Sequence, residues 1–274
     1  YLYLMKHLKG LFDFYINSSI HVAFAVLSLV FVTEKELELS LDFNFNSFIF
    51  LGTITGYNFV KYASVAGLHH RNLTKRLKVI QLFSFVCILA LAYFAFQFDL
   101  EFWLSCAPLA LLTALYAVPF LPNNTNLRTL PTLKIFIIAV VWAGVSVYLP
   151  VVYEASAFTT EFYLMLAQRF MLVLALIIPF EIRDLTYDSA ALGTLPQVLG
   201  IKKTKLFGLS MVLGCVILEV LKTETFSAYS IVQYCILLIT AFAILKSSTK
   251  QSSYYASFFV EGIPILWAIF ILAF

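Results

Sequence analysis

The chain alternates long apolar stretches with short polar connections from one end to the other. A membrane-spanning helix needs about 20 mostly apolar residues, and nine stretches of the 274-residue chain come close to that length. The expected spans cover approximately residues 15–33, 45–62, 79–98, 102–121, 132–153, 162–180, 205–221, 228–245 and 254–273. The pattern therefore predicts an all-α integral membrane protein of nine transmembrane helices, with a single domain over residues 1–274.

Composition agrees with this prediction and excludes several classes of protein. Hydrophobic residues make up 62% of the chain, charged residues 12%, and the mean hydropathy is +0.93, values typical of membrane proteins. The net charge of +3 gives no support for nucleic-acid binding. The four cysteines lie in or near the spans at unrelated spacings, so we expect them to be packing residues. The first apolar stretch lacks a clear cleavage site and is expected to be the first helix.

The basic residues of the connections predict the orientation in the membrane. Lys and Arg concentrate in cytoplasmic loops, and with a cytoplasmic N-terminus 15 of the 18 basic residues fall in inner segments. Only Lys35 and Lys222 fall outside, and Arg169 lies within a span. We expect the N-terminus in the cytoplasm, the C-terminus outside, and a location in a bacterial inner membrane.

Two inner connections are long and polar, and they follow the second and sixth expected spans. These spans run in the same direction, which indicates a parallel repeat with one site at the cytoplasmic ends.

The second of these connections begins with an acidic cluster at the end of a span. Glu181, Asp184 and Asp188 stand at positions i, i+3 and i+7, which places them on one helix face. Like charges so close are unfavourable without a cation, and Mg²⁺ binds carboxylates and substrate phosphates together. The cluster thus indicates a magnesium–diphosphate site. The alternative is that Arg183, Lys202 and Lys203 neutralise the acids in a hydrated loop.

The residues around this cluster resemble a known family. FEIRDLTYDSAALGTLPQVLG is similar to the second signature of the UbiA superfamily of intramembrane prenyltransferases, D-x-x-[RK]-D-x-x-x-D followed by a G…TLP…LG run. Two features depart from it: Glu181 replaces the leading Asp or Asn, and the segment between Asp188 and Thr194 is about one residue short and lacks a Gly-x-Lys. The passage LTALYAVPFLPNNTNLRTLPTLKIF also resembles the family's connection between its fourth and fifth helices.

The first signature of the family, N-x-x-x-D-x-x-x-D followed by R-T-x-x-R-P, is only half present. In NFVKYASVAGLHHRNLTKRL, Asn58 matches, but Tyr62 and Ala66 stand where the two aspartates are expected. Arg71, Asn72 and Lys75 keep the offsets of the basic tail. In the family the two motifs face each other and hold two Mg²⁺ ions on an isoprenyl diphosphate, so this chain has lost the ligands of one side.

The resemblance implies a UbiA-like helical bundle that transfers an isoprenyl group from an isoprenyl diphosphate to a lipophilic or aromatic acceptor within the membrane lipid. It implies Mg²⁺, one ion rather than two, on Glu181, Asp184 and Asp188. Asp184, Asp188 and Asn58 are the expected catalytic residues. The expected substrate-binding residues are Lys61, Tyr62, Arg71, Lys75, Arg76, Arg183 and Lys202. The alternative is a catalytically silent homologue that binds a lipid, a quinone or a partner protein, with the basic residues serving only the orientation.

Two ionisable residues lie inside expected spans, where such residues commonly pair. Arg169 and Glu261 are therefore candidates for a mutual salt bridge, and a small transporter using this region is a third hypothesis. His21 is expected to be a hydrogen-bonded packing residue.

Overall fold

A computed structural model describes residues 2–66, 75–120, 126–187, 192–222 and 227–273, and these residues form helices without any strand. In chain order the elements are α1 (Leu2–Asn17), α2 (Ile20–Glu36), α3 (Phe43–Ala66), α4 (Lys75–Ala95), α5 (Leu100–Ala117), the 3-10 helix η2 (Leu127–Thr129), α6 (Leu133–Ala143), the π-helix η3 (Gly144–Tyr148), α7 (Leu149–Tyr153), α8 (Thr160–Asp184), α9 (Leu195–Leu199), α10 (Ile201–Lys222), α11 (Ala228–Lys246), the π-helix η5 (Tyr255–Val260) and α12 (Ile263–Leu272). Each of the predicted spans overlaps one, two or three of these elements.

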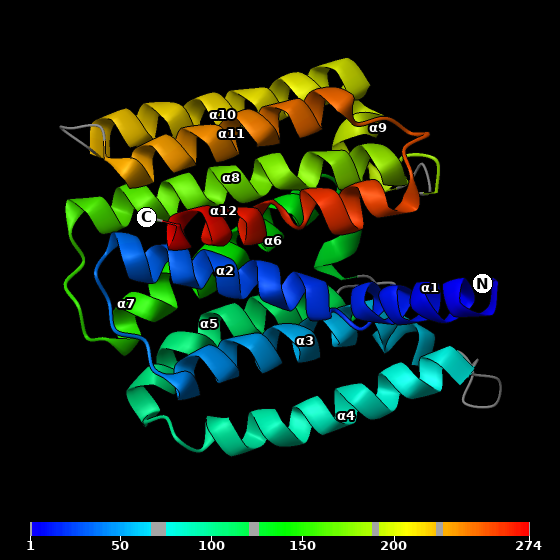
Figure 1. Ribbon diagram of the computed structural model, residues 1–274, viewed down its shortest axis with the longest axis horizontal. Helices are drawn as coiled ribbons and strands as arrows, with labels where there is room; N and C mark the ends of the chain where they lie inside the picture. Colours follow the sequence, from blue (N-terminus) through cyan, green and yellow to red (C-terminus); the bar gives the residue numbers. More distant parts are fainter. Residues whose placement is uncertain (1, 67–74, 121–125, 188–191, 223–226, 274) are drawn as a thin grey trace.

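The long helices lie side by side along the longest axis of the molecule (Figure 1). In that view α10 and α11 form one edge, α4 forms the other, and α8, α12, α2 and α3 lie between them. The closest helix neighbours include α8 with α10, α3 with α4, and α2 with α12. Leu29, Ile135, Ile178 and Ile236 are among the apolar residues buried at the centre of the bundle.

Seven helices of the described chain are long and apolar enough to cross a membrane, and the bent pair His7–Asn17 and Ile20–Glu36 makes an eighth. The 24-residue α3 is not one of these seven, and it packs against α2 and α4. The all-helical membrane architecture is thus confirmed, while the count of nine spans and the side of the N-terminus remain predictions.

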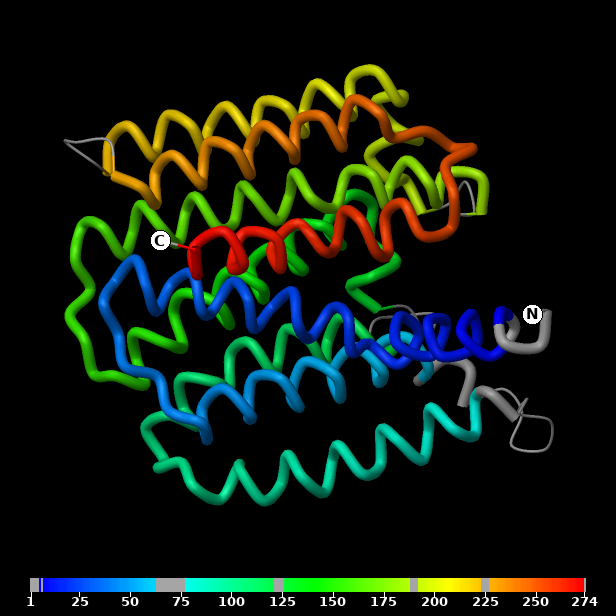
Figure 2. Tube along the Cα trace, in the orientation of Figure 1, coloured from blue at the N-terminus to red at the C-terminus, as the bar shows by residue number. Residues whose placement is uncertain are grey.

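The first predicted span is broken where we expected a continuous helix. The chain bends by 53° between α1 and α2, and Ser19 adopts a left-handed backbone with φ of 65°. The tube in Figure 2 shows α1 continuing away from α2 toward the N-terminus. The predicted start at residue 15 is therefore wrong. The apolar pattern gives no sign of this break, because hydrogen bonds from other helices stabilise it.

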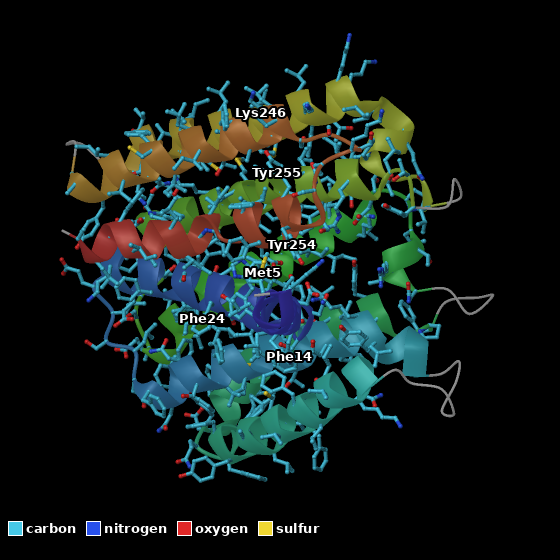
Figure 3. The ribbon with its side chains drawn as sticks, turned by 45° about the vertical axis from the view of Figure 1, so that its right-hand side comes forward. Met5, Phe14, Phe24, Lys246, Tyr254 and Tyr255 are labelled. Atoms are coloured by element: carbon cyan, nitrogen blue, oxygen red, sulfur yellow. The ribbon has the colours of Figure 1, made fainter. Side chains whose placement is uncertain are left out.

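Helix α1 is fixed to the C-terminal part of the chain by aromatic contacts. Tyr254 lies beside α1 in Figure 3, and its hydroxyl donates a 2.6 Å hydrogen bond to Asp13. The ring of Phe12 packs against Tyr254, with the centroids 5.1 Å apart, and the ring of Phe14 packs against Phe83 of α4. His21 of α2 is a buried packing residue as predicted: its ring contacts the Tyr15 hydroxyl and the Phe258 carbonyl, both at 2.9 Å.

Candidate functional site

An apolar cavity of about 630 Å³ lies between α3, α5 and the continuous segment α6–η3–α7. Its cationic lining residues are Lys61, near the end of α3, and Arg128 in η2. Both lie on segments that the sequence places at the cytoplasmic ends of the spans. Trp142 and Tyr57 also line the cavity, and the indole N–H of Trp142 donates a 2.6 Å hydrogen bond to the Tyr57 hydroxyl. The cavity is therefore an apolar chamber with positive charge at one end.

Charged residues from both halves of the sequence lie within electrostatic range of Lys61 at this end of the cavity. Glu261, at the junction between η5 and α12, interacts electrostatically with Lys61 of α3 and with Arg183 of α8. The prediction that the second and sixth spans contribute to one site is consistent with this arrangement. The predicted pair between Arg169 and Glu261 is wrong, because the Arg169 guanidinium instead binds Leu29 and Thr33 of α2.

Arg169 belongs to a separate polar cluster deep in the bundle. Its guanidinium donates hydrogen bonds to the Leu29 carbonyl (2.8 Å) and the Thr33 hydroxyl (3.3 Å), and it lies 5.2 Å from the Trp267 ring centroid. Next to it, Lys222 binds Glu36 at 2.6 Å and Glu219 at 3.2 Å, with all three side chains buried. These contacts join α2, α8 and α10, so Arg169 has a structural role.

The residues of the half-present first signature bind the break between α1 and α2. The Asn58 side chain accepts a hydrogen bond from the Ser19 hydroxyl (2.8 Å) and donates to the Ser18 carbonyl (3.0 Å) and to the Ser84 hydroxyl (2.8 Å). The Tyr62 hydroxyl donates to the Asn17 carbonyl at 2.9 Å, and the Lys61 ammonium donates to the Ser19 hydroxyl at 3.1 Å. Asn58 is buried and fully hydrogen-bonded, and Tyr62 replaces a carboxylate with a structural hydrogen bond.

The two described acids of the second signature, Glu181 and Asp184, are each close to a cation of the protein itself. Glu181 is buried and lies 2.8 Å from the ammonium of Lys134 at the start of α6. Both carboxylate oxygens of Asp184 bind the neighbouring Arg183, at 2.7 and 3.0 Å. Among the described residues no group of three His, Cys, Asp or Glu side chains is placed to hold a metal, and Asp188 lies outside them. The described carboxylates are engaged by cations and do not form a Mg²⁺ site in this arrangement.

The other predicted substrate-binding residues have varied positions. Lys202 is exposed in the first turn of α10, and Arg183 is half-buried with its guanidinium 5.2 Å from the Phe180 ring centroid. Arg71 lies outside the described residues, as do the side chains of Lys75 and Arg76. Arg128 and Lys134 were missed as site residues, because their sequence context indicated only an inner, basic connection.

The TLP…LG part of the signature builds a short turn of helix beside the site. Thr194 caps α9, and its N–H donates a 2.9 Å hydrogen bond to the Gln197 side chain. Gly193 and Gly200 both have positive φ values, 53° and 77°, which favour glycine. A side chain on Gly193 would come within 2.9 Å of Pro131, so this glycine lets the loop approach the connection before α6.

Comparisons with known proteins give matches of structure alone. No family model and no curated protein sequence matches the chain. The apo structure of a UbiA homologue from Aeropyrum pernix K1 matches with a TM-score of 0.66 at 13% identity, covering 93% of this chain and 98% of that one. A UbiA homologue from Archaeoglobus fulgidus bound to GPP and Mg²⁺ matches with a TM-score of 0.65 at 14% identity, covering 95% of this chain and 98% of that one. A digeranylgeranylglyceryl phosphate synthase structure matches with a TM-score of 0.55 at 15% identity over 95% of this chain and 98% of that one. The chain therefore has the fold of the UbiA homologues, which confirms, at the level of fold, the resemblance found in its sequence.

Proposed function

We propose that this chain is a UbiA-superfamily protein of the prenyltransferase type, which binds an isoprenyl diphosphate and transfers its isoprenyl group to a lipophilic acceptor. The observation that carries the proposal is the apolar cavity with Lys61 and Arg128 among its lining residues. A long apolar tail attached to a compact anion matches a chamber of this shape and charge.

Each part of such a ligand has a physical reason to bind. Burial of an apolar tail contributes about 25 cal/mol for each Å² removed from water, although a tail already in the bilayer gains less. Lysine and arginine bind phosphate oxygens with charge-assisted hydrogen bonds. The UbiA homologue from Archaeoglobus fulgidus bound to GPP and Mg²⁺ supports the same ligand class.

In the transfer reaction, the bond between the isoprenyl carbon and the diphosphate oxygen breaks and a bond from the acceptor to that carbon forms. The acceptor atom that forms this bond gives up its proton to water or to the departing diphosphate. The electron pair of the broken bond leaves with the diphosphate, so cations at the site stabilise the transition state. We assign this role to Lys61 and Arg128. Trp142 and Tyr57 line the cavity, and the faces of aromatic rings stabilise a developing carbocation.

A specific observation also favours the catalytically silent alternative. The described carboxylates of the second signature are bound by Lys134 and Arg183, and Tyr62 is hydrogen-bonded to Asn17. Use of Mg²⁺ therefore remains a prediction that requires Glu181 or Asp184 to exchange its partner. A silent homologue would keep the cavity and bind a lipid or quinone there.

An assay distinguishes the prenyltransferase from the silent homologue. It combines purified protein with labelled isoprenyl diphosphates of several lengths and Mg²⁺. Binding and pyrophosphate release are measured independently, with Lys61→Met as the test variant. The matched control is Lys250→Met, which changes an exposed lysine that does not line the cavity. We expect release by the wild type and the control and weaker donor binding by Lys61→Met. Binding without release from any donor establishes the silent homologue, and a complete absence of binding refutes the proposal.

A further inference from the structure

A second apolar hollow, of about 410 Å³, lies on the other side of the α6–η3–α7 segment from the main cavity. Its wall comes from α5, from α6 and η3, and from the first half of α8. Every lining side chain is apolar or a tyrosine, and Val140 and Tyr163 are exposed at its rim. We call this hollow the side groove.

Neighbouring residues of the segment α6–η3–α7 line different spaces, so this segment separates the two. Val140, Gly144 and Tyr148 line the side groove, and the residue after each of them, Val141, Val145 and Leu149, lines the main cavity. The same helical segment therefore serves as the wall of both spaces.

Leu109 of α5 is the residue that lines both spaces. It fits against Gly144, since a Cβ atom on that glycine would stand 2.6 and 2.8 Å from the two terminal methyl carbons of Leu109. The contact is possible only because Gly144 has no side chain. Leu109 therefore fills the gap between α5 and the wall at the point where the two spaces adjoin.

The position of Leu109 along α5 determines which part of a bound tail would pass it. Leu109 precedes Tyr116, another lining residue, by seven positions, which is about 10 Å along a helix axis. A tail that begins at the charged end thus passes Leu109 after a short distance into the bilayer.

From this geometry we propose that Leu109 and Gly144 form a partition that sets the length of isoprenoid tail accepted by the main cavity, with the side groove as the space that a longer tail would enter. The occupant of the side groove is the far end of an isoprenoid chain. The choice of an isoprenoid rests on the proposed function, but the partition itself is a property of the two spaces.

Two single substitutions alter the partition in opposite directions. Leu109→Ala joins the side groove to the main cavity, which favours longer tails. Gly144→Ala adds a methyl group that pushes the Leu109 side chain toward the main cavity, which favours shorter tails. Leu104→Ala is the matched control, since Leu104 lies on the same helix, is exposed and lines neither space.

The experiment measures dissociation constants for geranyl, farnesyl and geranylgeranyl diphosphate, and in parallel for the corresponding alcohols, which have the same tails without the anion. We expect Leu109→Ala to shift the ratio of geranylgeranyl to geranyl affinity upward by about tenfold, the size of effect that one or two methylene groups have in an apolar pocket. Gly144→Ala shifts it downward, and Leu104→Ala leaves it unchanged. Size-exclusion chromatography establishes that each variant is folded.

The two sets of ligands distinguish failure of the partition from failure of the proposed function. Unchanged length ratios in both folded variants, for diphosphates and alcohols alike, overturn the partition. Shifted ratios for the alcohols without any binding of diphosphates support the partition and refute the proposed function. The double variant Leu109→Ala/Gly144→Ala gives a further check, because the added methyl then meets no leucine and the ratio returns toward the Leu109→Ala value.

Discussion

Both polar atoms of the Asn58 side chain are bound within the protein, to Ser18, Ser19 and Ser84. The sequence resemblance assigned Asn58 to catalysis, but these contacts assign it to the break between α1 and α2. We expect Asn58→Ala to lower the Tm strongly, since each buried polar group left unsatisfied costs about 1–3 kcal/mol. Thermal unfolding in detergent measures this, with Lys250→Met, at an exposed position, as the comparison. If Asn58→Ala leaves the Tm unchanged but abolishes binding of the isoprenyl diphosphate, Asn58 belongs to the substrate site and the structural interpretation is wrong.

The ion pair between Lys134 and Glu181 supports a second prediction at the scale of single residues. Removing one partner of a buried pair costs about 3–5 kcal/mol, so Lys134→Met is expected to lower the Tm, and the double variant Lys134→Met/Glu181→Leu to recover part of it. The Tm is measured with and without Mg²⁺. If Mg²⁺ alone restores the stability of Lys134→Met, Glu181 is a metal ligand and the structural interpretation is wrong.

At the scale of helices, the buried cluster of Lys222, Glu36 and Glu219 fixes the end of α10 to the end of α2. We expect Lys222→Met to destabilise the bundle by about 3 kcal/mol or more, because two buried carboxylates lose their cation. Lys250→Met, at an exposed position, is the control. Equal Tm values for the two variants would show that the cluster adds nothing to stability.

Most helices were predictable from sequence, because an apolar run of the right length has few alternatives in a membrane. The break at Ser18–Ser19 was not predictable in the same way, since it is held by residues about 40 positions away. Asn58 binds the Ser18 carbonyl and the Ser19 hydroxyl, and Tyr62 binds the carbonyl of the preceding Asn17. For the same reason the sequence located Glu181 but not its partner Lys134, which is distant in the chain. Sequence spacing identifies neighbours on one helix, and only packing identifies neighbours between helices.

At the scale of the whole molecule, the basic connections predict a cytoplasmic N-terminus, with residue 250 inside and residue 156 outside. A variant without native cysteines provides the background, since Cys235 is exposed. An impermeant maleimide applied to intact cells is expected to label Ser156→Cys at once and Lys250→Cys only after permeabilisation. The reverse pattern would invert the topology, and would place the charged end of the cavity outside.

The π-helix η3 has a consequence for how relatives of this chain are compared by length. A π turn contains one residue more than an α turn, and Leu149 donates its N–H to the carbonyl of Gly144, five positions earlier. Removing one residue from this turn would rotate the following side chains by about 100°, so Tyr148 and Leu149 would no longer face their present spaces. A sequence with one residue fewer here can keep every helix and still present a different side chain to the side groove at the position of Tyr148. An alignment gap of one position within residues 144–148 therefore indicates a changed wall between the two spaces.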